Sequence, residues 1–216
     1  MAANAANALT FSLFNDRATW QAAIGGPTST EDFNSFVSDT VFSGTSIAAG
    51  DLTLIGNDVP GPFDTSSRIA VDPGFGGNFE DGTPAVAGDG LEFGESIVVQ
   101  LPGTFSAFGF DALNYDSDLQ GLDVFVGSDL VTSFPASFSG NFIGFIASDG
   151  SFDQVEFRSS SQGSSITEEF TFNSFDNVEW GGANTVTPPT PTTPEPAAVL
   201  GFVGVSLLSQ RLRKKK

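Results

Sequence analysis

The chain has 216 residues, enough for one domain and a short tail. It contains no cysteine and no histidine, which excludes disulfides, thiol chemistry, imidazole metal ligands and a Ser-His-Asp triad. Residues 1–184 carry three cations against 25 acids, a net charge of −22, and the remaining residues carry +4, which together make −18. Such an anionic domain repels nucleic acid and anionic membrane surfaces, so we expect no nucleic-acid partner.

The first eight residues are rich in alanine and asparagine. They lack the basic and apolar regions of a secretory signal, yet Ala6-Asn7-Ala8 has the small-x-small form of a cleavage site. We interpret residues 1–8 as the remnant or end of a signal peptide. The alternatives are a start upstream, a mature fragment given a new Met, and an ordinary N-terminus.

The next segment predicts a strand followed by a short helix. Leu9–Phe14 alternates between apolar and polar residues, which is typical of a strand. Asn15 or Asp16 can cap a helix through Trp20–Ile24, which the run Gly25-Gly26-Pro27 ends.

The rest of the domain reads as short strands separated by turns. Candidate strands cover 29–36, 51–56, 67–71, 91–101, 104–113, 121–127, 129–134, 141–147, 152–158, 166–172 and 175–181. Residues 9–184 are therefore predicted to form an all-β domain, a two-sheet β-sandwich or jelly roll with one short N-terminal helix. Most of the 23 phenylalanines, Phe125 among them, are expected to fill the space between the sheets, because their rings have no polar group.

The last thirty residues change character twice. Residues 185–194 form a Thr/Pro linker, which favours an extended, stiff stalk. Residues 197–208 carry no charge and predict a short hydrophobic helix, followed by a basic end at 211–216. Twelve residues make about 18 Å of helix, whereas the hydrocarbon core is about 30 Å thick. Insertion as a transmembrane helix therefore requires the bilayer to thin and the Arg and Lys side chains to snorkel to its surface. An apolar run with a basic end indicates a membrane address whose basic side stays in the cytoplasm.

The tail resembles the PEP-CTERM sorting signal of exported bacterial proteins. The resemblance lies in residues 194–216, in Pro194-Glu195-Pro196, the apolar run and the basic stop formed by Arg211, Arg213, Lys214, Lys215 and Lys216. It implies an exosortase substrate that uses the export machinery and is transiently anchored in the inner membrane by its C-terminal helix. It further implies processing near the tripeptide and delivery to the cell surface or the exopolysaccharide (biofilm) matrix.

The domain itself resembles exported β-sandwiches and, more loosely, carbohydrate-binding-module and lectin-like jelly rolls. The segments that carry this likeness are 105–113, 141–146, 152–157 and 175–180. It implies a fold and not a ligand.

The many carboxylate and amide side chains of the domain offer the oxygen ligands that calcium takes. A structural calcium ion is therefore the cofactor that we expect. The likeness to sandwich modules suggests a site that joins the first strand to a late aspartate, through Glu31, Asp32, Asn34 and Asp176. The alternative is a loop site at Asn114, Asp116 and Asp118, whose spacing matches the start of an EF-hand loop but not its turn glycine or final glutamate.

The function expected first is a non-enzymatic surface or matrix protein with a structural or adhesive role. The alternative is a carbohydrate-binding, lectin-like module for matrix polysaccharide, with Tyr115 and Trp180 as candidate ligand-binding aromatics. A secreted hydrolase would need two paired carboxylates, but acids are so abundant that no catalytic residue can be chosen. An ice-binding protein is a further alternative, although no flat threonine repeat is present.

Overall fold

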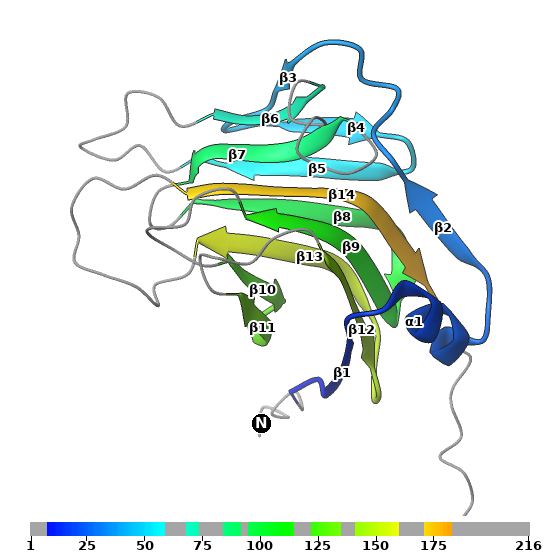
Figure 1. Ribbon diagram of the computed structural model, residues 1–216. Helices are drawn as coiled ribbons and strands as arrows, with labels where there is room; N and C mark the ends of the chain where they lie inside the picture. Colours follow the sequence, from blue (N-terminus) through cyan, green and yellow to red (C-terminus); the bar gives the residue numbers. More distant parts are fainter. Residues whose placement is uncertain are drawn as a thin grey trace, which may run out of the picture. The chain divides into compact units, whose positions relative to one another are not determined.

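A computed structural model of the chain describes residues 8–58, 68–73, 84–91, 95–114, 122–134, 141–159 and 171–182 (Figure 1). The chain divides into two compact units, residues 1–184 and 185–216, and all the described residues belong to the first. The predicted stalk, sorting motif, hydrophobic helix and basic end lie outside the described residues. Within the described ranges, no helix is both long and apolar enough to cross a membrane.

The described part of the chain contains one helix and fourteen strands (Figure 1). In order, they are β1 Phe11–Phe14, α1 Arg17–Ile24, β2 Thr28–Glu31, β3 Thr40–Val41, β4 Ser46–Ala49, β5 Leu52–Asn57, β6 Arg68–Asp72, β7 Ala85–Leu91, β8 Ser96–Phe105, β9 Ala107–Asn114, β10 Leu122–Val126, β11 Asp129–Phe134, β12 Asn141–Ala147, β13 Phe152–Ser159 and β14 Thr171–Gly181.

These strands form two antiparallel sheets. Among the described strands, eight belong to one sheet in the order β1-β12-β9-β14-β7-β6-β3, with β2 paired to β14. Six belong to the other, in the order β11-β10-β13-β8-β5-β4. Both sheets contribute to one buried apolar cluster, so the predicted two-sheet β-sandwich with a short helix is confirmed.

Phenylalanine rings join the two sheets, as the composition predicts. Phe157 on β13 stacks on Phe175 of β14 with ring centroids 4.3 Å apart, so the two rings link one sheet to the other. Phe110 packs edge-on against Phe157 at 5.0 Å. All three rings are almost completely buried. Because they carry no polar group, their burial leaves no hydrogen bond unmade.

The predicted helix is confirmed, and Asp16 is its cap. The Asp16 carboxylate accepts hydrogen bonds from the backbone N–H of Thr19, at 2.8 Å, and from its hydroxyl. These bonds lower the pKa of Asp16. Gly25 ends the helix in the left-handed conformation at φ 65°, which glycine adopts without strain. The helix packs against β12 through a second, smaller apolar cluster that contains Trp20 and Ile24.

Several predicted strands need correction. The two expected at 166–172 and 175–181 are one continuous strand over the described residues, β14. The strand expected at 29–36 ends at Glu31, because Phe33 turns the chain with φ 53°. The strand expected at 91–101 is β8, which begins at Ser96, and Leu91 is instead the last residue of β7. The sequence predicted neither β3 and β4 nor the rest of β7. β3 has two residues, half of β4 is alanine, and β7 is rich in alanine and glycine. Alanine and glycine have low β propensity, so only pairing with neighbours makes β4 and β7 strands.

Candidate functional site

A bulge in β14 shapes the polar surface beside the helix. Asp176 pairs with Asp111 of β9, but Glu179 pairs with Gly109, so between those pairs two residues of β14 lie opposite a single residue of β9. Asn177, one of the two, adopts a left-handed conformation at φ 47°. Phe175 and Val178 can therefore both point into the core, although they are three residues apart. The inserted residue shifts by one position the pattern in which successive side chains of β14 point into and out of the core.

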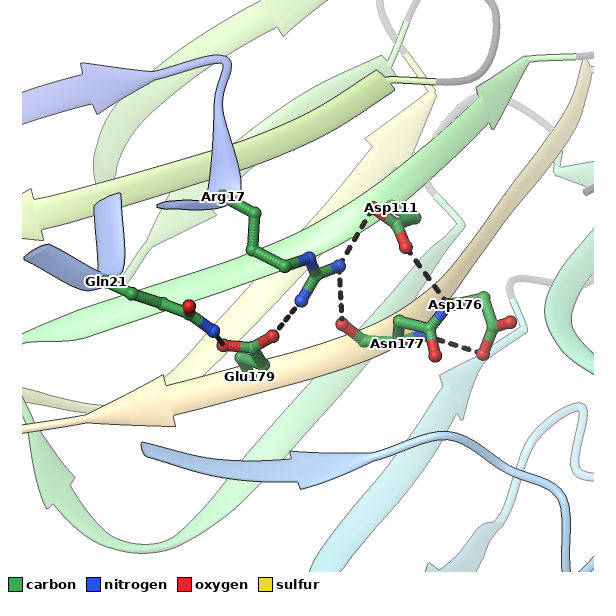
Figure 2. Close-up of polar contacts among 6 residues, drawn as sticks. All are labelled: Arg17, Gln21, Asp111, Asp176, Asn177 and Glu179. Carbon is green, nitrogen blue, oxygen red and sulfur yellow. Dashed lines mark hydrogen bonds and ion pairs between the residues drawn. The ribbon is translucent and has the colours of Figure 1, made fainter. Parts of the chain in front are cut away.

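The bulge brings polar side chains from two strands under α1 (Figure 2). The guanidinium of Arg17 forms ion pairs with Asp111, at 2.9 Å, and with Glu179. Its Nη2 also donates to the carbonyl oxygen of Asn177 at 3.5 Å. From the next turn of the helix, Gln21 Nε2 donates to Glu179 Oε2 at 2.9 Å. We call these residues, with Asp176, the Arg17 network.

Every described carboxylate oxygen that faces Arg17 has its own donor. Glu179 accepts from Arg17 at one oxygen and from Gln21 at the other. Asp111 accepts from Arg17 at Oδ1 and from the Asn177 side-chain amide at Oδ2, at 3.0 Å. Glu179 is only 4% exposed, so its charge needs these partners. The network therefore acts as a structural junction that holds α1 on the sheet.

The structure brings together the strands of the first predicted calcium set, but not its ligands. Val178 of β14 pairs with Glu31 of β2, which places β2 beside the bulge. Each carboxylate, however, bonds to the backbone of its own turn: Glu31 to Phe33 N–H, Asp32 to Asn34 N–H, and Asp176 to Asn177 N–H.

Among the described residues, no three acidic side chains lie close enough together to hold a metal ion. In the second set, Asp116 and Asp118 lie outside the described residues, and Asn114 is described only as the last residue of β9. Calcium binding remains a prediction from the sequence.

The Glu31 carboxyl lies close to the backbone of Gly50 and near two other carboxylates. A Cβ on Gly50 would lie 2.0 Å from Glu31 Oε2, so a side chain at residue 50 would displace the carboxyl from this position. Burial raises the pKa of Glu31, the hydrogen bond from Phe33 N–H lowers it, and the charges of Asp32 and Asp51 raise it further. The net pKa lies above the ordinary value.

Of the two predicted ligand-binding aromatics, one is buried and the other lies outside the described residues. Trp180 is 3% exposed and belongs to the core between the sheets, so it forms no open platform. Tyr115 lies outside the described residues. Trp20, the other tryptophan, is fully buried under the helix.

An aromatic ring that was predicted to lie in the core is found on the outer face of the six-stranded sheet. Leu122, Val124 and Val126 of β10 point into the core, so Phe125 between them points outward and is only partly buried. The guanidinium of Arg158 lies over its ring, 4.2 Å from the centroid. The same alternation was visible in the sequence and could have placed Phe125 outside; the predicted core position was wrong.

Arg158 is held in place by a carboxylate as well as by the ring. Its Nη2 lies 2.5 Å from Oε2 of Glu156. Burial raises the pKa of Glu156, but hydrogen bonds from Arg158 and Ser96 and the charge of Arg158 lower it below its ordinary value. The pKa of Arg158 is raised, chiefly by the hydrogen bond with Glu156. Both groups are therefore charged at neutral pH.

No protein-family model matches this sequence, and no curated protein does. Among solved structures, a mutant of a family 29 carbohydrate-binding module is 15% identical over 70% of this chain and 98% of its own, with a TM-score of 0.39. The K1 cleaved adhesin domain of Lys-gingipain from Porphyromonas gingivalis is 11% identical over 73% and 99%, with a TM-score of 0.41.

The catalytic domain of a GH87 alpha-1,3-glucanase, in complex with tetrasaccharides, is 11% identical over 79% of this chain, with a TM-score of 0.40. This chain spans 30% of the length of that domain.

Proposed function

We propose that this protein is exported and displayed at the cell surface or in the exopolysaccharide matrix, where its β-sandwich has a structural or adhesive role. The observation that carries the proposal is the order of segments at the C-terminus: a Thr/Pro linker, the Pro194-Glu195-Pro196 tripeptide, an uncharged apolar run and a basic end. Export machinery and an exosortase are the partners that such a tail requires. The complete lack of cysteine suits an oxidising compartment, because no incorrect disulfide can form there.

The proposal assigns no catalytic residue. The buried carboxylate of Glu179 and the neighbouring Asp111 have all their oxygens engaged by donors, which supports a structural role for both. Glu156 likewise has a lowered pKa and a guanidinium partner, whereas a general acid needs a raised pKa.

The test of export uses the full chain with a C-terminal epitope tag in a bacterium that has an exosortase. We expect wild-type protein at the surface without its tag, because processing near the tripeptide removes the end of the chain. Replacing Pro194, Glu195 and Pro196 by alanine should leave tagged protein in the inner membrane. Wild-type protein that stays in the cytosol with its tag would overturn the proposal.

A second candidate function is binding of matrix polysaccharide. It is favoured by the outward ring of Phe125 with Arg158 over it, an apolar surface beside fixed hydrogen-bonding groups. Sugar rings offer both C–H faces and hydroxyl groups, so they need surfaces of this mixed kind.

A further inference from the structure

Two rows of side chains cross the outer face of the six-stranded sheet. In the first, the strand pairings align, from one edge of the sheet inward, Leu130, Phe125, Glu156, Val98 and Ile55. In the second, they align Ser133, Asp123, Arg158, Ser96 and Asn57. We call them the Phe125 row and the Arg158 row. Each crosses β11, β10, β13, β8 and β5, a span of about 19 Å at roughly 4.8 Å between strands.

The two rows differ in chemistry and lie next to each other. The Phe125 row has four apolar side chains and one carboxylate, and Leu130 at its end is 53% exposed. The Arg158 row has only polar side chains, held by one another: Ser133 donates to Asp123 at 2.6 Å, and Asn57 donates to Ser96 at 2.9 Å. Val98 and Ser96 on β8 are only 7% and 2% exposed, so the accessible part of the two rows lies on β11, β10 and β13. That part is about 10 Å across, enough for a short stretch of an extended chain.

The net charge of the domain limits which class of ligand can bind to these two rows. Residues 1–184 carry a net charge of −22, which repels a polyanion. The Arg158 side chain, 42% exposed near the middle of the face, is paired with Glu156 and lies opposite Asp123, so it offers hydrogen-bond donors to a ligand rather than an uncompensated positive charge. A neutral, hydroxyl-rich polymer avoids the repulsion that a polyanion meets, and it suits a face that has both apolar and hydrogen-bonding side chains. Its hydroxyl groups can bond to guanidinium, carboxylate, amide and hydroxyl groups at once.

We propose that the Phe125 row and the Arg158 row together bind an extended neutral polysaccharide, whose C–H faces lie on Phe125 and Leu130 and whose hydroxyl groups face Arg158 and Asp123. The proposal rests on the second candidate function above and assigns its site. It places binding on the sheet opposite the one that carries the Arg17 network.

The test is native affinity electrophoresis of the full chain in gels that contain a neutral polysaccharide: dextran, hydroxyethylcellulose or glucomannan. Alginate serves as the polyanionic control. Leu130→Ala and Leu13→Ala form a matched pair, because both leucines are on edge strands and are 53% and 54% exposed. We expect at least one neutral polymer to retard the wild type, Leu130→Ala to weaken binding about three- to tenfold, and Leu13→Ala to leave it unchanged.

Phe125→Ala and Arg158→Gln extend the test, with thermal melting to confirm that each variant folds. Both should weaken binding about tenfold or more. Retardation of the wild type that neither Leu130→Ala nor Phe125→Ala reduces would overturn the site but keep the binding function. Lack of retardation in all three neutral polymers would overturn both and leave the export proposal standing. Retardation by alginate alone, or a change in sedimentation on Leu130→Ala that shows a second copy on this face, would also overturn the site.

Discussion

At the scale of single residues, Arg17 forms ion pairs with two carboxylates on two strands. It stands on the helix, yet its two charged partners lie on β9 and β14, far along the chain. Its guanidinium also lies 4.5 Å from the ring centroid of Phe142, so the side chain contributes packing as well as charge. Its removal would leave the buried Glu179 carboxylate with a single donor, Gln21.

We expect Arg17→Gln to lower the free energy of unfolding by about 1–3 kcal/mol, less than for a fully buried pair because Arg17 is partly exposed. Urea denaturation of the full chain at pH 7 measures this. The double variant Arg17→Gln with Glu179→Gln should recover part of the loss, because the uncompensated charge is gone. A double variant no more stable than Arg17→Gln would show that packing, and not charge, explains the effect.

Glu31 gives the domain a dependence on pH. Its folded pKa is raised, chiefly by burial, so between its unfolded and folded pKa values the folded state holds more protons than the unfolded state. Stability from this group therefore falls as the pH rises through that interval and is lowest above the folded pKa.

The variant Glu31→Gln keeps the shape and the acceptor for Phe33 N–H but removes the charge. We expect its melting temperature to exceed that of the wild type at pH 7, by about 1–2 °C, and the difference to shrink toward pH 4. Asp153→Asn, on the exposed surface of β13, removes one charge from the same anionic domain and is the control. If both variants gain equally at every pH, the effect is net charge and not the environment of Glu31.

At the scale of elements, two opposed glycines determine where the helix lies. Gly109 of β9 pairs with Gly144 of β12, and the ring of Trp20 covers both. A Cβ on Gly144 would lie 2.5 Å from Trp20 Cδ1, and one on Gly109 would lie 2.6 Å from the Phe142 ring. With no side chain in the way, the indole N–H of Trp20 reaches the carbonyl oxygen of Phe145 at 3.3 Å. The helix therefore packs, through Trp20, directly against the backbone of β9 and β12.

Gly144→Ala should therefore destabilise the protein by about 1–3 kcal/mol, as expected for overpacking against rigid rings. The matched control is Gly103→Ala in β8, where the nearest side-chain atom would be 3.7 Å away, an ordinary contact. Urea denaturation should show little or no loss for Gly103→Ala, and tryptophan fluorescence should shift only in Gly144→Ala. An unchanged stability of Gly144→Ala would show that the helix can move without cost.

At the scale of the whole molecule, uncompensated charge is the dominant feature. With −22 on residues 1–184, self-repulsion opposes the compact state, and added salt shortens its range to about 10 Å at 0.1 M. A specific divalent site would add to this screening only by binding the folded form.

We expect millimolar calcium to raise the melting temperature more than NaCl of equal ionic strength, because the oxygen-rich sequence predicts a site. A site stabilises by about 2.7 kcal/mol at a hundredfold excess of ion over Kd. Asp116→Ala should remove the difference, since the ligands of the rival set bond to their own turns. Identical melting curves in the two salts would leave screening as the whole effect.

The sequence by itself determined the features that depend on local pattern and composition. The period of two in Leu122, Val124 and Val126 predicts a strand with one core face, and the content of phenylalanine predicts an apolar layer between sheets. Asn15 or Asp16 was the predicted helix cap, and the structure selects Asp16. Such signals are local, because capping and alternation involve residues a few positions apart. The sorting tail, likewise a linear signal, remains a prediction from sequence.

Only the tertiary structure decided which polar residues meet. Arg17 and Glu179 are 162 residues apart, and Leu130, Phe125 and Ile55 share a row solely through strand pairing. The bulge at Asn177 could not be predicted either, because the inserted residue breaks the alternation between Phe175 and Val178, and only the pairing with β9 shows that one strand continues through the break. Sequence patterns indicate which way a side chain points; pairing between distant strands decides what it faces.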